Sequence, residues 1–256
     1  PLNRLIAMKE LLIGDNSLNR VNDVKLDRLN RLELVDIGSD SFKNSDNNGL
    51  YLSDLPLLKK VAIGSNSFIN YDVLIVTHVP FLEELSVGNG CLKDVSSLDL
   101  NGMTDLKRVT IGSSSFSNKN GSFSVVNCPS LESVEIGSSS MGAYSVLSVE
   151  NTPSLEVLSI GSTSFMNANA LRLNGLSKLK RVEINANSFN GDCGDFSLTN
   201  CGSVTELVFR DGSMKSFKSI EIASVPLLAT VEIGSNSFSN VLEWELNGLP
   251  QLRRVV

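Results

Sequence analysis

The sequence is poor in the residues on which most enzymes depend. Its 256 residues include a single histidine, His78, which lies in the string "VTHVP". One histidine excludes most catalytic arrangements in which an imidazole activates a neighbouring nucleophile of the same chain. We interpret His78 as a solvated side chain on a turn. The sequence therefore predicts a protein that is not an enzyme and that carries no cofactor.

Cysteine is also scarce, and its spacing fits neither a metal site nor a disulfide framework. The four cysteines are Cys91, Cys128, Cys193 and Cys201, and no two of them form a C-x-x-C pair. Zinc sites and small disulfide-rich domains both show regular cysteine spacing, which is absent here. We expect mostly free thiols and no metal site.

The chain lacks a long hydrophobic run and an excess of positive charge. No stretch approaches the roughly 18 uninterrupted apolar residues of a membrane helix, and no basic-then-apolar leader opens the chain. The formal net charge of −6 gives no drive to bind nucleic acid through counterion release. We therefore expect a protein partner or self-association, with no nucleic acid partner and no direct membrane insertion within this segment.

What the sequence has in abundance is repetition. The string "LKKVAIGSNSF" begins at Leu58, and close copies begin at Leu32, Leu106, Leu155, Leu179 and Leu228. The residue that follows the apolar pattern recurs every 24 to 26 residues, at Gly14, Gly38, Gly64, Gly88, Gly112, Gly137, Gly161, Asn185, Arg210 and Gly234. A fixed period of this length predicts a solenoid in which each repeat is stabilised by its neighbours.

Two alternating apolar patterns in each repeat predict two strands. The pattern L-x-x-L-x-L favours a short strand that pairs with the same strand of the next repeat in a parallel sheet. A second pattern, as in "LRLNGL" from Leu171, predicts short strands on the opposite face. No segment shows a sustained period near 3.6 residues, so very little helix is expected. The predicted fold is all-β or nearly so, a single solenoid over 1–256 of about ten 24–26-residue repeats.

Three positions after the main strand are expected to shape the corner of each repeat. Gly64 and its equivalents supply either a left-handed backbone or a close approach, although Arg210 does not fit the first account. The side chain of Asn66 and its equivalents is expected to bond backbone groups of the bend. The last position should form one apolar spine along the solenoid, from Phe42, Phe68, Phe116, Phe165, Phe189 and Phe238, with Leu18, Leu92, Met141 and Met214 as substitutes.

These positions carry a resemblance to a known superfamily. Leu58, Val61, Ile63, Asn66 and Phe68 follow the leucine-rich-repeat pattern, and equivalent residues recur across essentially the full chain. The I-G-x-x-S-F string is also similar to the I-G-x-x-A-F signature of BspA-like surface proteins of bacteria and protists. The resemblance implies a curved leucine-rich-repeat solenoid used for recognition or adhesion, with no chemistry of its own.

A longer period contains three repeats. "LKRV" at 106, "LKRV" at 179 and "LRRV" at 252 lie 73 residues apart, and extended loops follow Phe42, Phe116 and Phe189. The chain opens inside a repeat at "PLNRL" and stops inside one at "LPQLRRVV", so we expect an uncapped fragment of a longer array. Asn120, in the string "NGS", is a candidate glycosylation site if a eukaryote secretes the chain.

Charged residues at the outward positions of the main strand form the candidate partner-binding face. They are Lys59, Lys60, Glu83, Glu84, Lys107, Arg108, Glu132, Glu156, Lys180, Arg181, Arg253 and Arg254. One interpretation is a ligand surface with basic pairs at regular intervals. The other is a ladder of opposite charges that stabilises strand pairing by about 0.2–1 kcal/mol per pair. Both interpretations stay open.

The sequence favours a recognition or adhesion module at the cell surface or outside the cell. One alternative is a structural array that associates with copies of itself as a coat, stalk or filament. A second alternative is an intracellular, cytoplasmic scaffold, which the free thiols would suit.

Overall fold

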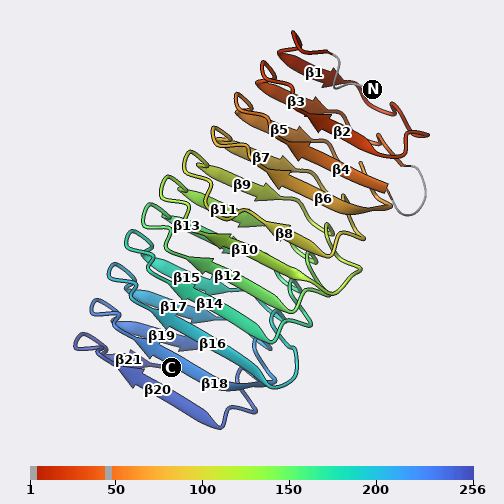
Figure 1. Ribbon diagram of the computed structural model, residues 1–256. Coiled ribbons are helices and arrows are strands. Elements are labelled where there is room, and N and C mark those ends of the chain that lie inside the picture. The colour runs from red at the N-terminus through yellow and green to blue at the C-terminus, as the bar shows by residue number, and fades with distance from the viewer. Residues whose placement is uncertain (1–4, 44–47) are drawn as a thin grey trace.

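The computed structural model describes residues 5–43 and 48–256 as a solenoid of stacked coils (Figure 1). Each coil gives one strand to a long main sheet and a second strand to the opposite side. All strand pairs are parallel, and the described part of the chain contains no helix. The predicted all-β solenoid is confirmed. The predicted loop after Phe42 and the string "PLNRL" lie partly outside the described residues.

The main sheet has eleven strands, which follow one another in chain order because each coil adds the next strand. They are β1 (Glu10–Ile13), β3 (Leu34–Ile37), β5 (Lys60–Ile63), β7 (Glu84–Val87), β9 (Arg108–Ile111), β11 (Ser133–Ile136), β13 (Val157–Ile160), β15 (Arg181–Ile184), β17 (Glu206–Phe209), β19 (Thr230–Ile233) and β21 (Arg254–Val255). Side chains alternate along a strand, so that in β5 Val61 and Ile63 are buried while Lys60 is exposed.

The opposite side is divided into two sheets. Three strands form the first, β2 (Val24–Asp27), β4 (Asn48–Ser53) and β6 (Tyr71–Thr77). Seven form the second, β8 (Ser97–Asp99), β10 (Ser122–Val126), β12 (Val146–Glu150), β14 (Ala170–Asn174), β16 (Gly194–Thr199), β18 (Phe217–Ala223) and β20 (Glu243–Asn247). β6 and β8 belong to consecutive coils but do not pair. We call the boundary between them the seam.

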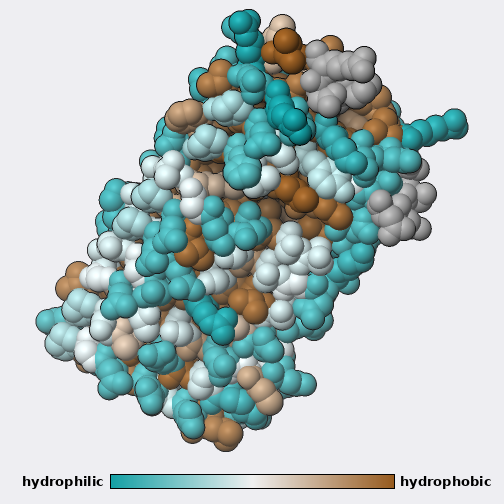
Figure 2. Space-filling model, viewed as in Figure 1, coloured by the Kyte–Doolittle hydropathy of each residue, from teal (hydrophilic) through white to brown (hydrophobic). Residues whose placement is uncertain are grey.

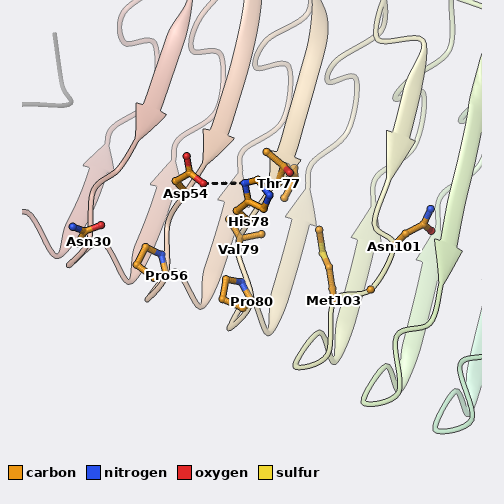
Figure 3. A pocket seen from close by; sticks show the side chains of 11 residues that line it. Asn30, Asp54, Pro56, Thr77, His78, Val79, Pro80, Asn101 and Met103 are labelled. Atoms are coloured by element: carbon orange, nitrogen blue, oxygen red, sulfur yellow. Dashed lines mark ion pairs between the residues drawn. The ribbon is translucent and has the colours of Figure 1, made fainter.

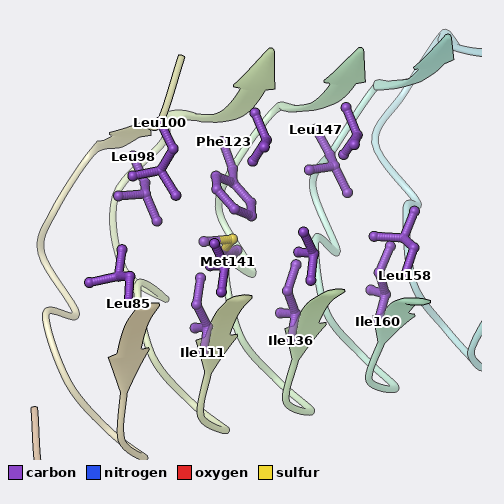
Figure 4. Close-up of a cluster of buried hydrophobic side chains, with 14 of the residues drawn as sticks. Leu85, Leu98, Leu100, Ile111, Phe123, Ile136, Met141, Leu147, Leu158 and Ile160 are labelled. Atoms are coloured by element: carbon purple, nitrogen blue, oxygen red, sulfur yellow. The ribbon is translucent and has the colours of Figure 1, made fainter. Parts of the chain in front are cut away.

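The core lies between the main sheet and the opposite strands. Figure 4 shows Leu98, Phe123 and Leu147 from one side facing Ile111 and Ile136 from the other. The predicted spine runs beside this layer and is confirmed from Phe42 to Phe238, whereas Leu18 in the first coil is exposed. Phe42 stacks on Phe68 with ring centroids 4.6 Å apart, and the rings of Phe165 and Phe189 stack at 5.0 Å.

The corners of the coil use a left-handed backbone at non-glycine residues. In the third coil, Asn66, Phe68 and His78 have φ of 56°, 54° and 52°. Equivalent residues in the other coils repeat these values, apart from a few glycines. Such a φ costs energy for any residue with a side chain, and most of all for a bulky one. The spine phenylalanines therefore occupy an unfavourable backbone conformation that burial of their rings offsets.

The structure corrects the expected role of the corner asparagines. The Asn66 side chain makes no hydrogen bond within the described residues. The next residue, Ser67, bonds the backbone of the bend instead. Its hydroxyl donates to the Gly38 carbonyl at 2.8 Å and accepts from the Ser41 N–H at 3.0 Å. Similar bonds recur from coil to coil and form a buried serine ladder, made of Ser41, Ser67, Ser115, Ser140, Ser164 and Ser188, with Cys91 in the fourth coil.

Close approach to the preceding coil favours glycine after the main strand. A Cβ on Gly64 would lie 2.5 Å from the carbonyl carbon of Gly38 in the preceding coil, and Gly64 has no positive φ. The left-handed explanation was therefore wrong for this position. Where Arg210 replaces the glycine, the serine of the ladder bonds a carbonyl of its own coil. The Ser213 hydroxyl donates to the Arg210 carbonyl at 2.7 Å, whereas the Ser67 hydroxyl donates to the preceding coil.

The block of three repeats has a structural counterpart in large buried side chains. The Tyr71 hydroxyl donates to the Val21 carbonyl at 2.8 Å, and the Tyr144 hydroxyl, 73 residues later, donates to the Val95 carbonyl at 2.9 Å. Each bond crosses two coils. The third member is Phe217, whose ring would contact a Cβ placed on Gly194 at 2.5 Å.

Candidate partner-binding surfaces

The outward side chains of the main sheet form rows along the solenoid. Strand register places Lys60 opposite Glu84, and Glu84 opposite Arg108, on β5, β7 and β9. The sequence therefore predicted correctly that these charges are neighbours. Regular coil spacing turns a sequence repeat into a surface repeat.

Several of these charges form ion pairs between adjacent coils. Lys60 lies 3.2 Å from Glu84, and Lys107 lies 2.7 Å from Glu83. Lys59 pairs with Glu33 at 3.5 Å. The hydrogen bond from Lys107 holds the pKa of the Glu83 carboxyl below its ordinary value. All are partly exposed, so each contributes little to stability.

A denser cluster surrounds Glu183 near the other end of the face. The Arg181 guanidinium contacts Glu206 and also Glu183, the latter at 2.9 Å, and Arg210 reaches Glu183 at 2.6 Å. Partial burial opposes ionisation of Glu183, but the two guanidinium groups outweigh it and lower the pKa of its carboxyl. Sequence reasoning missed the role of Arg210, although it is the only charged residue at the glycine position of the repeat.

The candidate face thus contains paired and unpaired charges. Within residues 5–43 and 48–256, the paired members are Lys59, Lys60, Glu83, Glu84, Lys107, Glu156 and Arg181, whereas Arg108, Glu132, Lys180, Arg253 and Arg254 form no ion pair. Each interpretation of the sequence describes part of this face. The unpaired members are the ones whose charges remain available to a partner.

The seam is a second candidate surface, on the opposite side of the solenoid. Where coils stack normally, as at β12 and β14, the Asn151 N–H donates to the Asn174 carbonyl and the Asn169 N–H to the Ser145 carbonyl, both at 2.9 Å. The equivalent bonds at the seam would join His78 to Asn101 and Ser96 to Asp72. Neither is present between these described residues. The facing backbone edges of β6 and β8 are therefore open.

Core side chains are partly uncovered at the seam. Leu74 and Val76 point toward the core from β6 but are only half-buried, whereas the equivalent Leu147 and Val149 on β12 are fully buried. On the outer surface Ile75 is 38% exposed. Figure 2 shows a hydrophobic patch over β6.

Two cavities follow the seam. One of about 620 Å³ lies at its corner end and is lined by Val76, Val79, Asn101 and Met103 among others. A second of about 350 Å³ runs along β6 and β8. Figure 3 shows His78 at the first cavity, where its Nδ1 lies 2.9 Å from Asp54 Oδ1. The sole histidine is thus a largely exposed turn residue, as the sequence predicted, with a carboxylate partner.

The other end of the seam is bridged. Lys119, in the corner of the fifth coil, reaches past the fourth coil to Asp72 at the start of β6, with Nζ 3.5 Å from Oδ2. The second carboxylate oxygen, Oδ1 of Asp72, is buried without a hydrogen-bond partner. The neighbouring Asn120, the candidate glycosylation site, is exposed in the same corner.

All four cysteines are free thiols, and only Cys193 is exposed. Among the described residues no group of three or more His, Cys, Asp or Glu side chains is arranged to hold a metal ion. No helix long and apolar enough to cross a membrane occurs in that part of the chain. No protein-family model, no curated protein and no solved structure matches this chain.

Proposed function

We propose that the protein is a non-enzymatic recognition or adhesion module that binds a protein partner through the outward face of its main sheet. The observation that carries the proposal is the set of unpaired charges, Arg108 and Glu132 above all, on a face where strand register holds side chains in fixed rows. Charged rows of this kind favour a broad protein contact of modest affinity over a small-molecule pocket.

The resemblance to leucine-rich-repeat surface proteins supports the same proposal. It also supports a location at the cell surface or outside the cell, where a repeated rigid surface would serve adhesion. A self-associating array remains the competing function, and the experiment below separates the two.

The test combines light scattering with binding to immobilised, purified extracellular-matrix and cell-surface proteins. The proposal expects a monomer over a wide concentration range and saturable binding to a subset of the panel. That binding should weaken as salt rises, because exposed charges are screened. It should weaken at least about fivefold in Arg108→Glu.

The matched control is Arg172→Glu, which changes an exposed arginine on the opposite side of the solenoid. It should leave panel binding unchanged. Concentration-dependent assembly of the wild-type chain would support the structural array instead, and equal binding by the charge-reversed variant would rule out the main face.

A further inference from the structure

We propose that an amphipathic helix of a protein partner binds along the corner where the chain returns from the opposite strands to the main sheet. The site is a line of four side chains from successive coils, Arg31, Leu57, Phe81 and Asp105, which we call the corner row. This goes beyond the proposed function, because the contact is made at the corner and not by the outward charges of the main sheet. Either site can fail its test while the other stands.

Backbone hydrogen bonds hold the corner row in line. The Lys59 N–H donates to the Glu33 carbonyl at 2.9 Å. The same bond recurs from Glu83 to Lys59 and from Lys107 to Glu83, both at 2.8 Å. Each of these residues lies two positions after a member of the row. The four side chains therefore follow one another at the spacing of paired strands, about 4.8 Å per coil.

The two middle members of the row are apolar and exposed. Leu57 is 41% exposed and Phe81 is 48% exposed. In the later coils the same position is polar or charged, apart from Leu227, whose neighbours along the row are Ser203 and Gln251. Scattered exposed apolar side chains are ordinary, whereas an exposed aromatic side chain beside a second apolar one is typical of a protein interface.

A cavity adjoins this apolar pair. The larger cavity of the seam, of about 620 Å³, is lined by Pro56, Val79 and Pro80 among others. The two prolines directly precede the apolar pair of the row. Figure 3 shows Pro56, Pro80 and Met103 in succession along the corner. Apolar side chains of a partner can therefore enter the cavity while the backbone of the partner stays outside the solenoid.

The spacing of the row favours a helix as the partner. Side chains three or four residues apart on a helix follow one another at about one turn, roughly 5.4 Å, which is close to the spacing of the coils. Side chains on one face of an extended strand are about 6.8 Å apart and fall out of step with the coils sooner. A helix laid along the corner therefore meets all four members of the row.

The ends of the row set the charges that the helix should carry. Arg31 and Asp105 form no ion pair within the described residues. Lys107, which also attracts Asp105, is held 2.7 Å from Glu83. A helix with an acidic, two apolar and a basic side chain in succession on one face would complement the row. An acidic residue near the start of the helix and a basic one near its end also suit the helix dipole.

The experiment is a fluorescence-anisotropy titration of a labelled synthetic helix with the complete chain. The probe is an alanine-based peptide in which glutamate, leucine, leucine and lysine follow one another three or four residues apart, so that all four share one face. Saturable binding is expected, and a scrambled peptide of the same composition should bind at least about tenfold more weakly. Phe81→Asp should weaken binding at least about tenfold, because it places a charge in the apolar part of the row.

The matched control is Leu227→Asp, which makes the same kind of change at the equivalent exposed position before β19. It should leave the affinity for the peptide unchanged. Arg31→Glu tests the charge at one end of the row. It should weaken binding about fivefold and should restore binding to a peptide whose glutamate is replaced by lysine.

Absence of saturable binding would overturn the proposal, as would undiminished binding by a folded Phe81→Asp chain. Circular dichroism and the melting temperature show whether that variant is folded. If it is not, the exchange of peptide preference in Arg31→Glu decides. Dimerisation of the chain that Phe81→Asp abolishes would also overturn the proposal, because a second copy would then cover the corner.

Discussion

The seam and its closed counterpart one block later show what makes two coils stack. β6 lies in "YDVLIVTHVP" from Tyr71 and β12 in "YSVLSVENTP" from Tyr144, with the same leucine and valine directed inward. β12 pairs fully with β14, but β6 does not pair with β8. The inward pattern of the strand is therefore insufficient to close a pair of coils.

The two regions differ at the preceding corner. Before the closed boundary between β12 and β14, the corner has Ser164 and Phe165, and the Ser140 N–H donates to the Ser164 hydroxyl at 3.3 Å. The corner before the seam has Cys91 and Leu92 at these positions. Sulfur is a weak acceptor and leucine is smaller than phenylalanine, so this corner holds its neighbour less firmly. The Cys91 thiol nevertheless donates to the Gly64 carbonyl at 3.1 Å, so this corner is a difference between the two regions whose effect on stacking can be measured.

The largest expected difference between the two regions concerns buried leucines. Leu147→Ala should lower the free energy of unfolding by about 3–5 kcal/mol, because it leaves a cavity in a closed core. Leu74→Ala should cost less than about 2 kcal/mol, since solvent already reaches this side chain. Urea denaturation of both variants measures the difference. Equal losses would mean that the seam is closed in solution.

The next effect concerns the bond that crosses two coils. Tyr144→Phe removes the hydroxyl that donates to the Val95 carbonyl and leaves that acceptor unpaired. We expect a loss of about 1–2 kcal/mol in the free energy of unfolding. Tyr51→Phe serves as the control, because the Tyr51 side chain is half-exposed, and it should change stability by less than about 0.5 kcal/mol. An unchanged free energy of unfolding in Tyr144→Phe would contradict the assigned bond.

A smaller effect should follow from repairing the serine ladder. Cys91→Ser gives the Ser67 N–H a hydroxyl acceptor like those of the other coils. We therefore expect the free energy of unfolding to rise by about 0.5–1 kcal/mol. The converse change, Ser164→Cys, should lower the free energy of unfolding by a similar amount at the closed boundary between β12 and β14. Thermal denaturation of the pair provides the measurement. Destabilisation by Cys91→Ser would show that the corner does not limit stacking.

Thiol reactivity tests whether the corner before the seam opens locally. We expect its effect to be the smallest. In the folded chain only Cys193 should react rapidly with a thiol reagent at pH 8. Burial raises the pKa of Cys91 and Cys201 to about 11, so little thiolate forms until the pH approaches that value. Mass spectrometry after brief alkylation identifies the labelled residues. Rapid labelling of Cys91 but not Cys201 would mean that the seam opens as far as its corner.

Much of the fold could be predicted from the sequence because it is set by periodic burial. The strands on both sides and the spine from Phe42 to Phe238 follow from which residues recur every 24 to 26 positions. The serine ladder was missed, although a hydroxyl before the spine residue in every coil but the fourth was a visible sign of it. A pattern of residue types does not say which polar side chain turns inward.

Other features had no sign in the sequence. Phenylalanine rarely adopts a left-handed φ, so nothing predicted this conformation at Phe68. The seam has no sign in the apolar pattern, because β6 and β8 keep the normal one. On the candidate face, the order of charges predicted which residues are neighbours, but only geometry separates paired Lys107 from unpaired Arg108.

Residue-resolved hydrogen exchange of the free chain tests the central claim most directly, that one pair of coils is left open in an otherwise continuous stack. The amides of Leu74, Val76 and His78 should exchange at least about a hundredfold faster than those of Leu147, Val149 and Asn151. Equal protection of the two sets would contradict the open seam.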